Sequence, residues 1–167
     1  FVSVIAIALV IRLLPARNNN FYFTMDQGND AVHVREILIR HQILLRGPET
    51  GIQGFYHQPL WYYFIAVGYA ATGGHPLGAV LMLIILNLAT VAFLMYKIAQ
   101  KVNPATAIAV GASLQFFWWF YDASRYGFNP FLLVALSILL ILFLIDFKTY
   151  PPAAVPVGLA FHSETAA

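Results

Sequence analysis

The run from Leu77 to Tyr96 constrains this chain more than any other stretch of its sequence. It is apolar almost throughout, and Asn87 is its only strongly polar side chain. A helix of about 20 consecutive apolar residues matches the thickness of the hydrocarbon core of a bilayer. Lys97 and Lys101 follow the run, and a turn is expected at Asn103 and Pro104. The run therefore predicts a membrane-spanning helix that ends at a basic boundary.

Composition extends this prediction to the rest of the 167 residues, of which 60% are hydrophobic and 10% charged. About a quarter of the residues of a soluble domain are charged, so this is the composition of a membrane protein. We expect an all-α fold, a polytopic transmembrane helix bundle that forms a single transmembrane domain and is a fragment of a longer protein. The expected spans are about 1–15, 77–96, 105–121, 130–146 and 153–167, with an outer loop carrying amphipathic helices at 18–74. Without cysteine the chain has neither disulfides nor thiolate metal sites, and its net charge of +2 gives no indication of nucleic acid binding.

The first apolar segment, Phe1 to Leu14, is short for a span, and the competing interpretation is the core of a signal peptide. No small-x-small cleavage site follows it, and Arg12 interrupts the apolar run near its end. We therefore interpret the segment as a transmembrane helix. The simplest role for Arg12 is to extend its long side chain to the membrane interface.

Residues 18–55 form the one long polar stretch. Ala31, Val34, Leu38 and Leu45 recur at helical spacing beside charged residues, which predicts an amphipathic helix at about 29–45. The glycine-rich segment 46–54 lacks the lysine and Ser/Thr spacing of a phosphate-binding loop. Residues 55–63 then gather aromatic side chains around Pro59, a composition favoured at the headgroup level of a bilayer, and a helix should follow to about Ala71.

Alternation of the spans gives an orientation. Placing Lys97, Lys101 and Lys148 in the cytoplasm follows the positive-inside rule. Three polar clusters then lie on the outer side: the loop that holds Asp26, the turn at 122–130, and the end that holds His162 and Glu164. Arg17 and Arg125 also fall outside, against the rule. In either orientation the three clusters share one membrane face, and we predict a multi-pass protein of the plasma (inner) membrane with an extracytoplasmic site.

Four segments, in this order, carry a resemblance to a known family: D-Q-G-N-D at 26–30, V-R-E-I-L at 34–38, H-Q-P-L-W-Y-Y at 57–63 and S-R-Y-G-F-N-P at 124–130. Their order and spacing resemble bacterial glycosyltransferase family 39, whose relatives include protein mannosyltransferases and aminoarabinose transferases. The similarity covers nearly all of this chain but only the N-terminal portion of a typical member. It implies a GT-C-type fold and an enzyme that moves a sugar from a polyprenyl-phosphate-linked donor to a lipid, glycan or protein acceptor.

The resemblance also implies roles for particular residues. Asp26 matches the first acidic position of the family's catalytic pair, and Gln27 stands where the second acid is expected. Asp30 is the alternative carboxylate, so the general base stays open between the two, and of these the sequence favours Asp26. Arg125 and His57 are the candidate donors to the lipid phosphate. Glu164, near the end of the last expected span, is a further candidate for substrate binding, because ionisable groups there are costly and frequently functional.

Each of these residues also has a structural interpretation. Asp26 is suited to capping the helix that follows it, and Asp30 in a first helical turn is favoured by the helix dipole. His57, near a proline, is suited to a structural role, and Arg125 to anchoring at the interface. The spacing of Asp26, Asp30 and His33 also fits a divalent metal site, although a solvated surface is the simpler interpretation. We therefore predict no certain cofactor.

The competing function is a transporter or flippase-like membrane protein for an amphiphilic or lipid-linked substrate. Such a protein should place polar residues near mid-membrane on broken helices, often with internal repeats. Here the polar residues gather at the ends of the expected helices, and no internal repeat is found. The sequence therefore favours the enzyme, whose partners would be the lipid-linked donor, its acceptor and membrane lipids.

Overall fold

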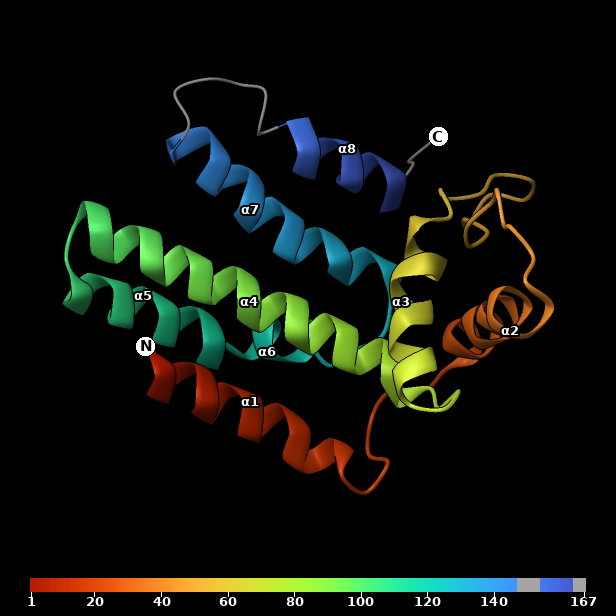
Figure 1. The fold of residues 1–167 in the computed structure, drawn as a ribbon, viewed down its shortest axis with the longest axis horizontal. Coiled ribbons are helices and arrows are strands. Elements are labelled where there is room, and N and C mark those ends of the chain that lie inside the picture. Colours follow the sequence, from red (N-terminus) through yellow and green to blue (C-terminus); the bar gives the residue numbers. More distant parts are fainter. Residues whose placement is uncertain (147–153, 164–167) are drawn as a thin grey trace.

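A computed structural model describes residues 1–146 and 154–163 of the chain, and within these residues the fold is all-α, as predicted. The helices are α1 (Val2–Ala16), α2 (Met25–Arg40), α3 (Leu60–Ala71), α4 (Leu77–Lys101), α5 (Pro104–Phe116), α6 (Trp118–Ala123), the 3-10 turn η1 (Asn129–Phe131), α7 (Leu132–Asp146) and α8 (Ala154–Ser163) (Figure 1).

Helix α4 is the centre of the arrangement and packs against α1, α3, α5 and α7 (Figure 1). Its two termini define the two ends of the molecule. The lysine end carries Lys97, Lys101 and the turn into α5, and the loop end carries α2, α3 and the segment 41–59. Helix α8 contacts α3, so its backbone also reaches toward the loop end. Glu164 and Lys148 lie outside the described residues.

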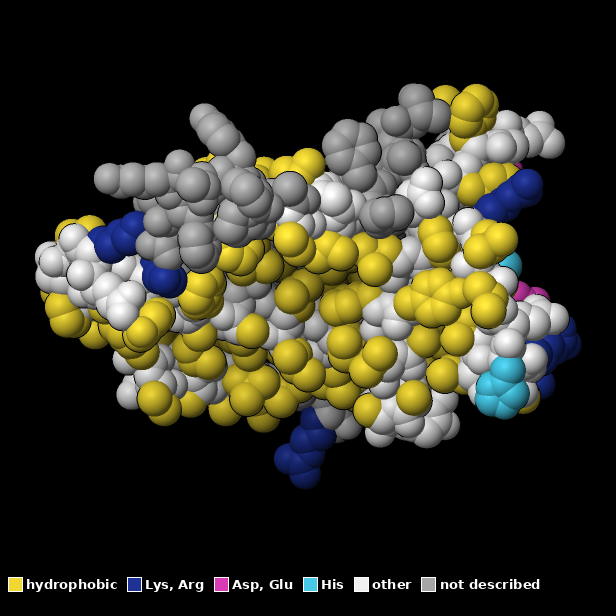
Figure 2. Space-filling model, turned by 45° about the horizontal axis from the view of Figure 1, so that its top comes forward, with side chains coloured by type: hydrophobic (Ala, Val, Ile, Leu, Met, Phe, Trp, Pro, Cys, Tyr) yellow, Lys and Arg dark blue, Asp and Glu magenta, His cyan; other side chains and the backbone are white. Residues whose placement is uncertain are grey.

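One helix among the described residues, α4, is long and apolar enough to cross a membrane. Helices α1 and α3 and the stretch Asn129–Leu144 are apolar but shorter. Figure 2 shows a face that is largely hydrophobic between the two ends, with Lys and Arg side chains at the lysine end and a mixture of charged and histidine side chains at the loop end. The exposed apolar side chains include Val10 on α1 and Ile85 on α4, which are 52% and 59% exposed.

The predicted helix at 105–121 is interrupted. Asn103 accepts a hydrogen bond from the backbone N–H of Thr106 at 2.8 Å, and Pro104 occupies the first turn, so α5 begins as a capped helix. Phe117 then adopts an extended conformation, with φ −67° and ψ 124°, and separates α5 from α6. The chain therefore turns within what was expected to be one continuous span.

The amphipathic helix also has different bounds from those predicted. Helix α2 begins four residues earlier than expected and ends at Arg40, because His41 adopts a left-handed conformation with φ 54°. Val34 is fully buried in the core, with Ala31 and Leu38 packed beside it, as the periodicity predicted. Leu45 lies beyond the helix and is 80% exposed, so its place in the predicted pattern was wrong.

Helices α3 and α4 approach each other closely at a pair of glycines. A Cβ atom added to Gly68 would collide with the backbone carbonyl of Gly78, and one added to Gly78 would collide with the backbone of Gly68. Only glycine allows this approach. The contact fixes α3, and with it Trp61 and Tyr62, against the start of α4.

Arg12 does not extend to an interface, and that prediction was wrong. Its side chain is 0% exposed and donates three hydrogen bonds, to Ser124 Oγ at 2.7 Å, to the Ala8 carbonyl at 3.1 Å and to the Gln115 carbonyl at 3.1 Å. Its guanidinium also lies 5.5 Å from the centre of the Tyr121 ring. The bonds to Gln115 and Ser124 join α1 to the end of α5 and to the residue that follows α6, and they satisfy donors of a fully buried guanidinium.

Replacing Arg12 by alanine should therefore destabilise the fold. The substitution leaves a cavity and removes the donors to Ser124 and Gln115, at a cost of about 2 kcal/mol or more. For a chain of this size that corresponds to a fall in Tm of roughly 4–8 °C. Thermal unfolding in detergent should show this loss for Arg12→Ala and a change within about 1 °C for Arg17→Ala, because Arg17 is exposed. Equal Tm values for the two variants would contradict the assigned role of Arg12.

Candidate functional site

The loop end holds a cleft of about 640 Å³ to which three separate segments contribute. Its lining residues are Met25, Asp26, Asn29 and Asp30 of α2, Pro48, Glu49, Thr50, Gly51 and His57 of the following loop, and Phe128, Asn129 and Pro130. The fold thus brings together the acidic loop and the turn at 122–130, two of the three polar clusters that the sequence placed on one face. Of the five predicted site residues, Asp26, Asp30 and His57 line this cleft.

The start of α2 gives Gln27 a structural role. Thr24 is the N-cap residue, and Gln27 Oε1 accepts hydrogen bonds from the Thr24 backbone N–H at 2.7 Å and from Thr24 Oγ1 at 2.6 Å. Such a reciprocal cap is a known way to satisfy the free donors of a helix start. The structural interpretation of Asp26 as the helix cap was therefore wrong, because Thr24 is the N-cap. It lies in the first turn, where the helix dipole favours a negative charge, and its side chain is exposed at the cleft.

Asp30 lies one turn further along α2 and is only 4% exposed. Trp61 of α3, itself fully buried, donates its Nε1 hydrogen to Asp30 Oδ2 at 2.7 Å. Burial raises the pKa of Asp30 to about 6, the negative charge of Asp26 adds to this rise, and the hydrogen bond from Trp61 opposes it. Asp30 is therefore a carboxyl group largely shielded from solvent, with a pKa close to neutral pH.

Trp61 and Tyr62 correct the interpretation of the aromatic segment. The sequence placed 55–63 at the headgroup level of a bilayer, but Trp61 and Tyr62 are 0% and 1% exposed and belong to the core beneath α2. Nothing in the sequence around Trp61 indicated that it would donate a hydrogen bond to Asp30. Asn29 and Glu49 in the cleft wall were likewise not singled out by the sequence.

His57 is positioned by the backbone of the glycine-rich loop. Its N–H donates to the Pro48 carbonyl at 2.8 Å, and its own carbonyl accepts from the Gly47 N–H at 2.8 Å. A Cβ atom on Gly47 would collide with the backbone of Gln58, so this pairing requires glycine at that position. The half-buried His57 side chain is thereby fixed at the wall of the cleft that the start of α2 also lines.

Arg125 does not line this cleft. Its Nη1 donates to the Tyr121 hydroxyl at 2.7 Å, its Nη2 to the Asn20 carbonyl at 3.2 Å, and its guanidinium lies 5.1 Å from the centre of the Tyr121 ring. Arg125 therefore joins the turn at 122–130 to the segment after α1. The same turn supplies Asn129, which is 4% exposed, to the cleft wall. Glu164, the remaining predicted site residue, lies outside the described residues.

Within residues 1–146 and 154–163, no group of three or more Asp, Glu or His side chains is placed to hold a metal ion. His33 turns instead toward Glu36, with Nδ1 3.1 Å from Glu36 Oε2. Asp26 and Asp30 remain as a pair of carboxylates beside polar amide and imidazole groups. This arrangement is suited to accepting a proton and to binding hydroxyl groups.

Comparison with known proteins adds no identification. No protein-family profile, no curated protein and no solved structure matches this chain. The resemblance to glycosyltransferase family 39 therefore stays a prediction from the sequence motifs.

The pKa of Asp30 gives a direct test of the site. In a protein with Trp118→Phe and Trp119→Phe, Trp61 is the remaining tryptophan, and its emission should change with a midpoint near pH 6 as Asp30 ionises. Asp30→Asn should abolish this transition, and Asp26→Asn should move it to lower pH, because the charge of Asp26 raises the pKa of Asp30.

The same shift has a consequence for stability. The pKa of Asp30 rises from 3.8 in the unfolded chain to about 6 in the folded protein. Between about pH 4 and 6 the folded protein keeps a proton that the unfolded chain has lost, so the free energy of unfolding should fall as pH rises through this range. Asp30→Asn should lack this fall. An emission transition near pH 6 that persists in Asp30→Asn would show that another group titrates there.

Proposed function

We propose that this chain is part of an integral membrane glycosyltransferase that moves a sugar from a polyprenyl-phosphate-linked donor to a lipid, glycan or protein acceptor. The observation that carries the proposal is Asp30, a buried carboxyl with a raised pKa at the wall of a cleft. Perturbed carboxyl groups in clefts are typical of catalytic sites. The cleft lies at one end of an apolar helix bundle, where a lipid-borne donor and a water-exposed acceptor can meet.

Asp30 is the residue we assign as general base. The hydrogen bond from Trp61 occupies Oδ2 and leaves Oδ1 to accept a proton. In the transfer step the acceptor hydroxyl loses its proton to Asp30 as its oxygen bonds to the anomeric carbon. The bond from that carbon to the phosphate oxygen breaks, and its electron pair leaves with the polyprenyl phosphate. A base with a pKa of about 6 is mostly ionised at neutral pH and close enough to it for efficient proton transfer.

Asp26 and His57 have supporting roles in this proposal. The charge of Asp26 adds to the rise that burial produces in the pKa of Asp30, and its exposed carboxylate is available to hydroxyl groups of the donor sugar. His57 lines the same cleft and is suited to contacting the leaving phosphate. Arg125 is held by Tyr121 and Asn20 and would have to leave these partners to reach a phosphate.

The membrane arrangement belongs to the same proposal. Helix α4 crosses the bilayer, and α1, α5 with α6, and α7 run beside it as further membrane segments of a multi-pass protein in the plasma (inner) membrane. The positive-inside rule places Lys97 and Lys101 in the cytoplasm. The cleft at the opposite end of α4 then opens on the extracytoplasmic side.

A transporter for an amphiphilic or lipid-linked substrate is the alternative, and one observation favours it. The break at Phe117 lies close in sequence to Gln115, whose carbonyl binds the buried Arg12, and broken helices with buried polar groups are common in transporters. However, Arg12 is bound by Ser124, Ala8 and Gln115 of the chain itself. All three guanidinium nitrogens of Arg12 therefore have partners within the chain, and none of these residues lines the cleft, so we prefer the enzyme.

Sugar transfer by the full-length protein in phospholipid nanodiscs tests the proposal, with polyprenyl-phosphate hexoses and pentoses as donors. Asp30→Asn should lower kcat by about 10²- to 10⁴-fold, the usual contribution of a general base. Wild-type kcat should rise with pH to a plateau above pH 6, because Asp30 must be ionised to act. Asp122→Asn is the matched control, since Asp122 does not line the cleft, and it should keep wild-type kcat.

Two results would contradict the assignment. Transfer that is unaffected by Asp30→Asn and by Asp26→Asn would remove both carboxylates from the chemistry. Movement of lipid-linked sugar across vesicle membranes without any transfer would favour the transporter.

A further inference from the structure

A second lobe of about 600 Å³ adjoins the cleft, and the two share Asn29 and Glu49 in their walls. One side of the lobe is α2, through Asn29, His33 and Glu36. The other side is the segment 43–47 together with Tyr56. The sequence assigned no role to this segment, and the cleft chemistry described above does not use it.

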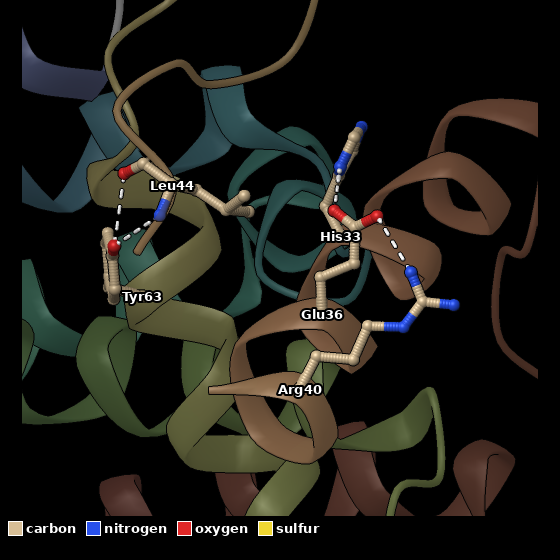
Figure 3. Close-up of polar contacts among 5 residues, drawn as sticks. All are labelled: His33, Glu36, Arg40, Leu44 and Tyr63. Atoms are coloured by element: carbon tan, nitrogen blue, oxygen red, sulfur yellow. Dashed lines mark hydrogen bonds and ion pairs between the residues drawn. The ribbon is translucent and has the colours of Figure 1, made fainter. Parts of the chain in front are cut away.

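The outer wall of the lobe is held in place by one tyrosine. The Tyr63 hydroxyl accepts a hydrogen bond from the Leu44 N–H at 2.9 Å and donates one to the Leu44 carbonyl at 3.0 Å (Figure 3). Leu44 packs against the core, whereas Ile43 and Leu45 on either side of it are each 80% exposed. Ile43 and Leu45 both line the lobe, so they form an apolar border beside its polar groups.

The charges of the lobe disfavour an anionic ligand. Glu36 and Glu49 both line it. Glu36 lies between His33, at 3.1 Å, and Arg40, at 3.9 Å, and its side chain is 25% exposed (Figure 3). The one arginine in the lining, Arg46, lies over the Tyr56 ring at 5.3 Å. Carboxylate and amide oxygens accept hydrogen bonds from hydroxyl groups, and a partly exposed aromatic ring offers a flat apolar contact.

The lobe runs along α2, and this sets the orientation of a ligand bound in it. Glu36, His33 and Asn29 lie on one face of α2, about one turn apart. A ligand that fills the lobe therefore extends along α2 toward its N-terminus and ends at Asn29, where the lobe opens into the cleft. Asp30 lines the cleft and not the lobe, so a group that reaches past Asn29 enters the hollow that holds the base, as a transfer between two bound molecules requires.

We propose that this lobe is the acceptor subsite and that it binds an uncharged, hydroxyl-rich group of the sugar type, whose reactive hydroxyl reaches past Asn29 into the cleft that Asp30 lines. Its assignment to an acceptor rests on the proposed function, whereas sugar binding in the lobe can be measured without any transfer. Ile43 and Leu45 contact an apolar substituent on that group, and Tyr56 contacts its ring.

Photolabelling of the full-length protein in nanodiscs tests this binding. The probes are octyl glucoside, octyl galactoside and octyl mannoside with a diazirine in the alkyl chain, and the control probe is the same chain without a sugar. At least one sugar probe should label residues 43–45, and unlabelled octyl glycoside should compete with it. The control probe should show no such preference for this segment.

Three variants connect the label to the lobe. Tyr56→Leu should reduce the labelling by about fivefold, since an aromatic contact contributes on the order of 1 kcal/mol, and Tyr56→Phe should retain it. Phe55→Leu is the matched control, because Phe55 is the adjacent exposed aromatic residue and does not line the lobe. Its labelling should equal that of the wild type.

The outcomes separate this proposal from the proposed function. Equal labelling of 43–45 by the sugar-free probe, absence of label there with all three sugars, or full labelling of Tyr56→Leu would overturn the sugar site. If transfer activity is present in that case, the proposed function stands and only the lobe assignment falls. Sugar-dependent labelling in a protein that lacks transfer activity would support the sugar site and remove its role as an acceptor subsite.

Discussion

The hydrogen bond from Trp61 to Asp30 is the interaction on which the loop end of the molecule depends. A carboxyl group that is almost completely buried is costly unless a donor compensates it, and Trp61 is that donor. The bond joins α2 to α3, and the close approach of Gly68 and Gly78 joins α3 to α4. These two contacts therefore fix the position of the carboxyl group relative to α4. The same burial that makes Asp30 costly raises its pKa and makes it suitable as a base.

A separate polar anchor positions the other wall of the cleft. Arg12 holds Ser124 and the end of α5, and Arg125 holds Asn20 beside them, with Tyr121 in contact with both guanidinium groups. These contacts fix the turn that carries Phe128, Asn129 and Pro130 to the cleft. Both anchors consist of a buried polar group satisfied by specific partners, and such groups constrain geometry more tightly than apolar packing alone. The two walls come from parts of the chain about 100 residues apart, so both anchors are needed to form one site.

The sequence predicted the coarse features and missed those that depend on tertiary contacts. Apolar runs located α4 and most other helices, and the acidic pair at 26 and 30 was found from its position after an apolar segment. The role of Gln27 was also readable, because Thr24 and Gln27 have the spacing of a capping box. The break at Phe117 was not predicted. The burial of Arg12 and Trp61 carried no local signal, since each depends on partners far away in the chain. For the same reason the sequence favoured Asp26 as the base, whereas burial favours Asp30.

We propose that the three segments of the cleft meet at one membrane face, opposite the lysine end. The chain has no cysteine, so Gly51→Cys, Phe128→Cys and Lys101→Cys can each be labelled in intact cells with a membrane-impermeant thiol reagent. Gly51→Cys and Phe128→Cys should react from outside, and Lys101→Cys should react only after the membrane is permeabilised. Labelling of Gly51→Cys and Phe128→Cys from opposite sides, or of Lys101→Cys together with them, would contradict the account.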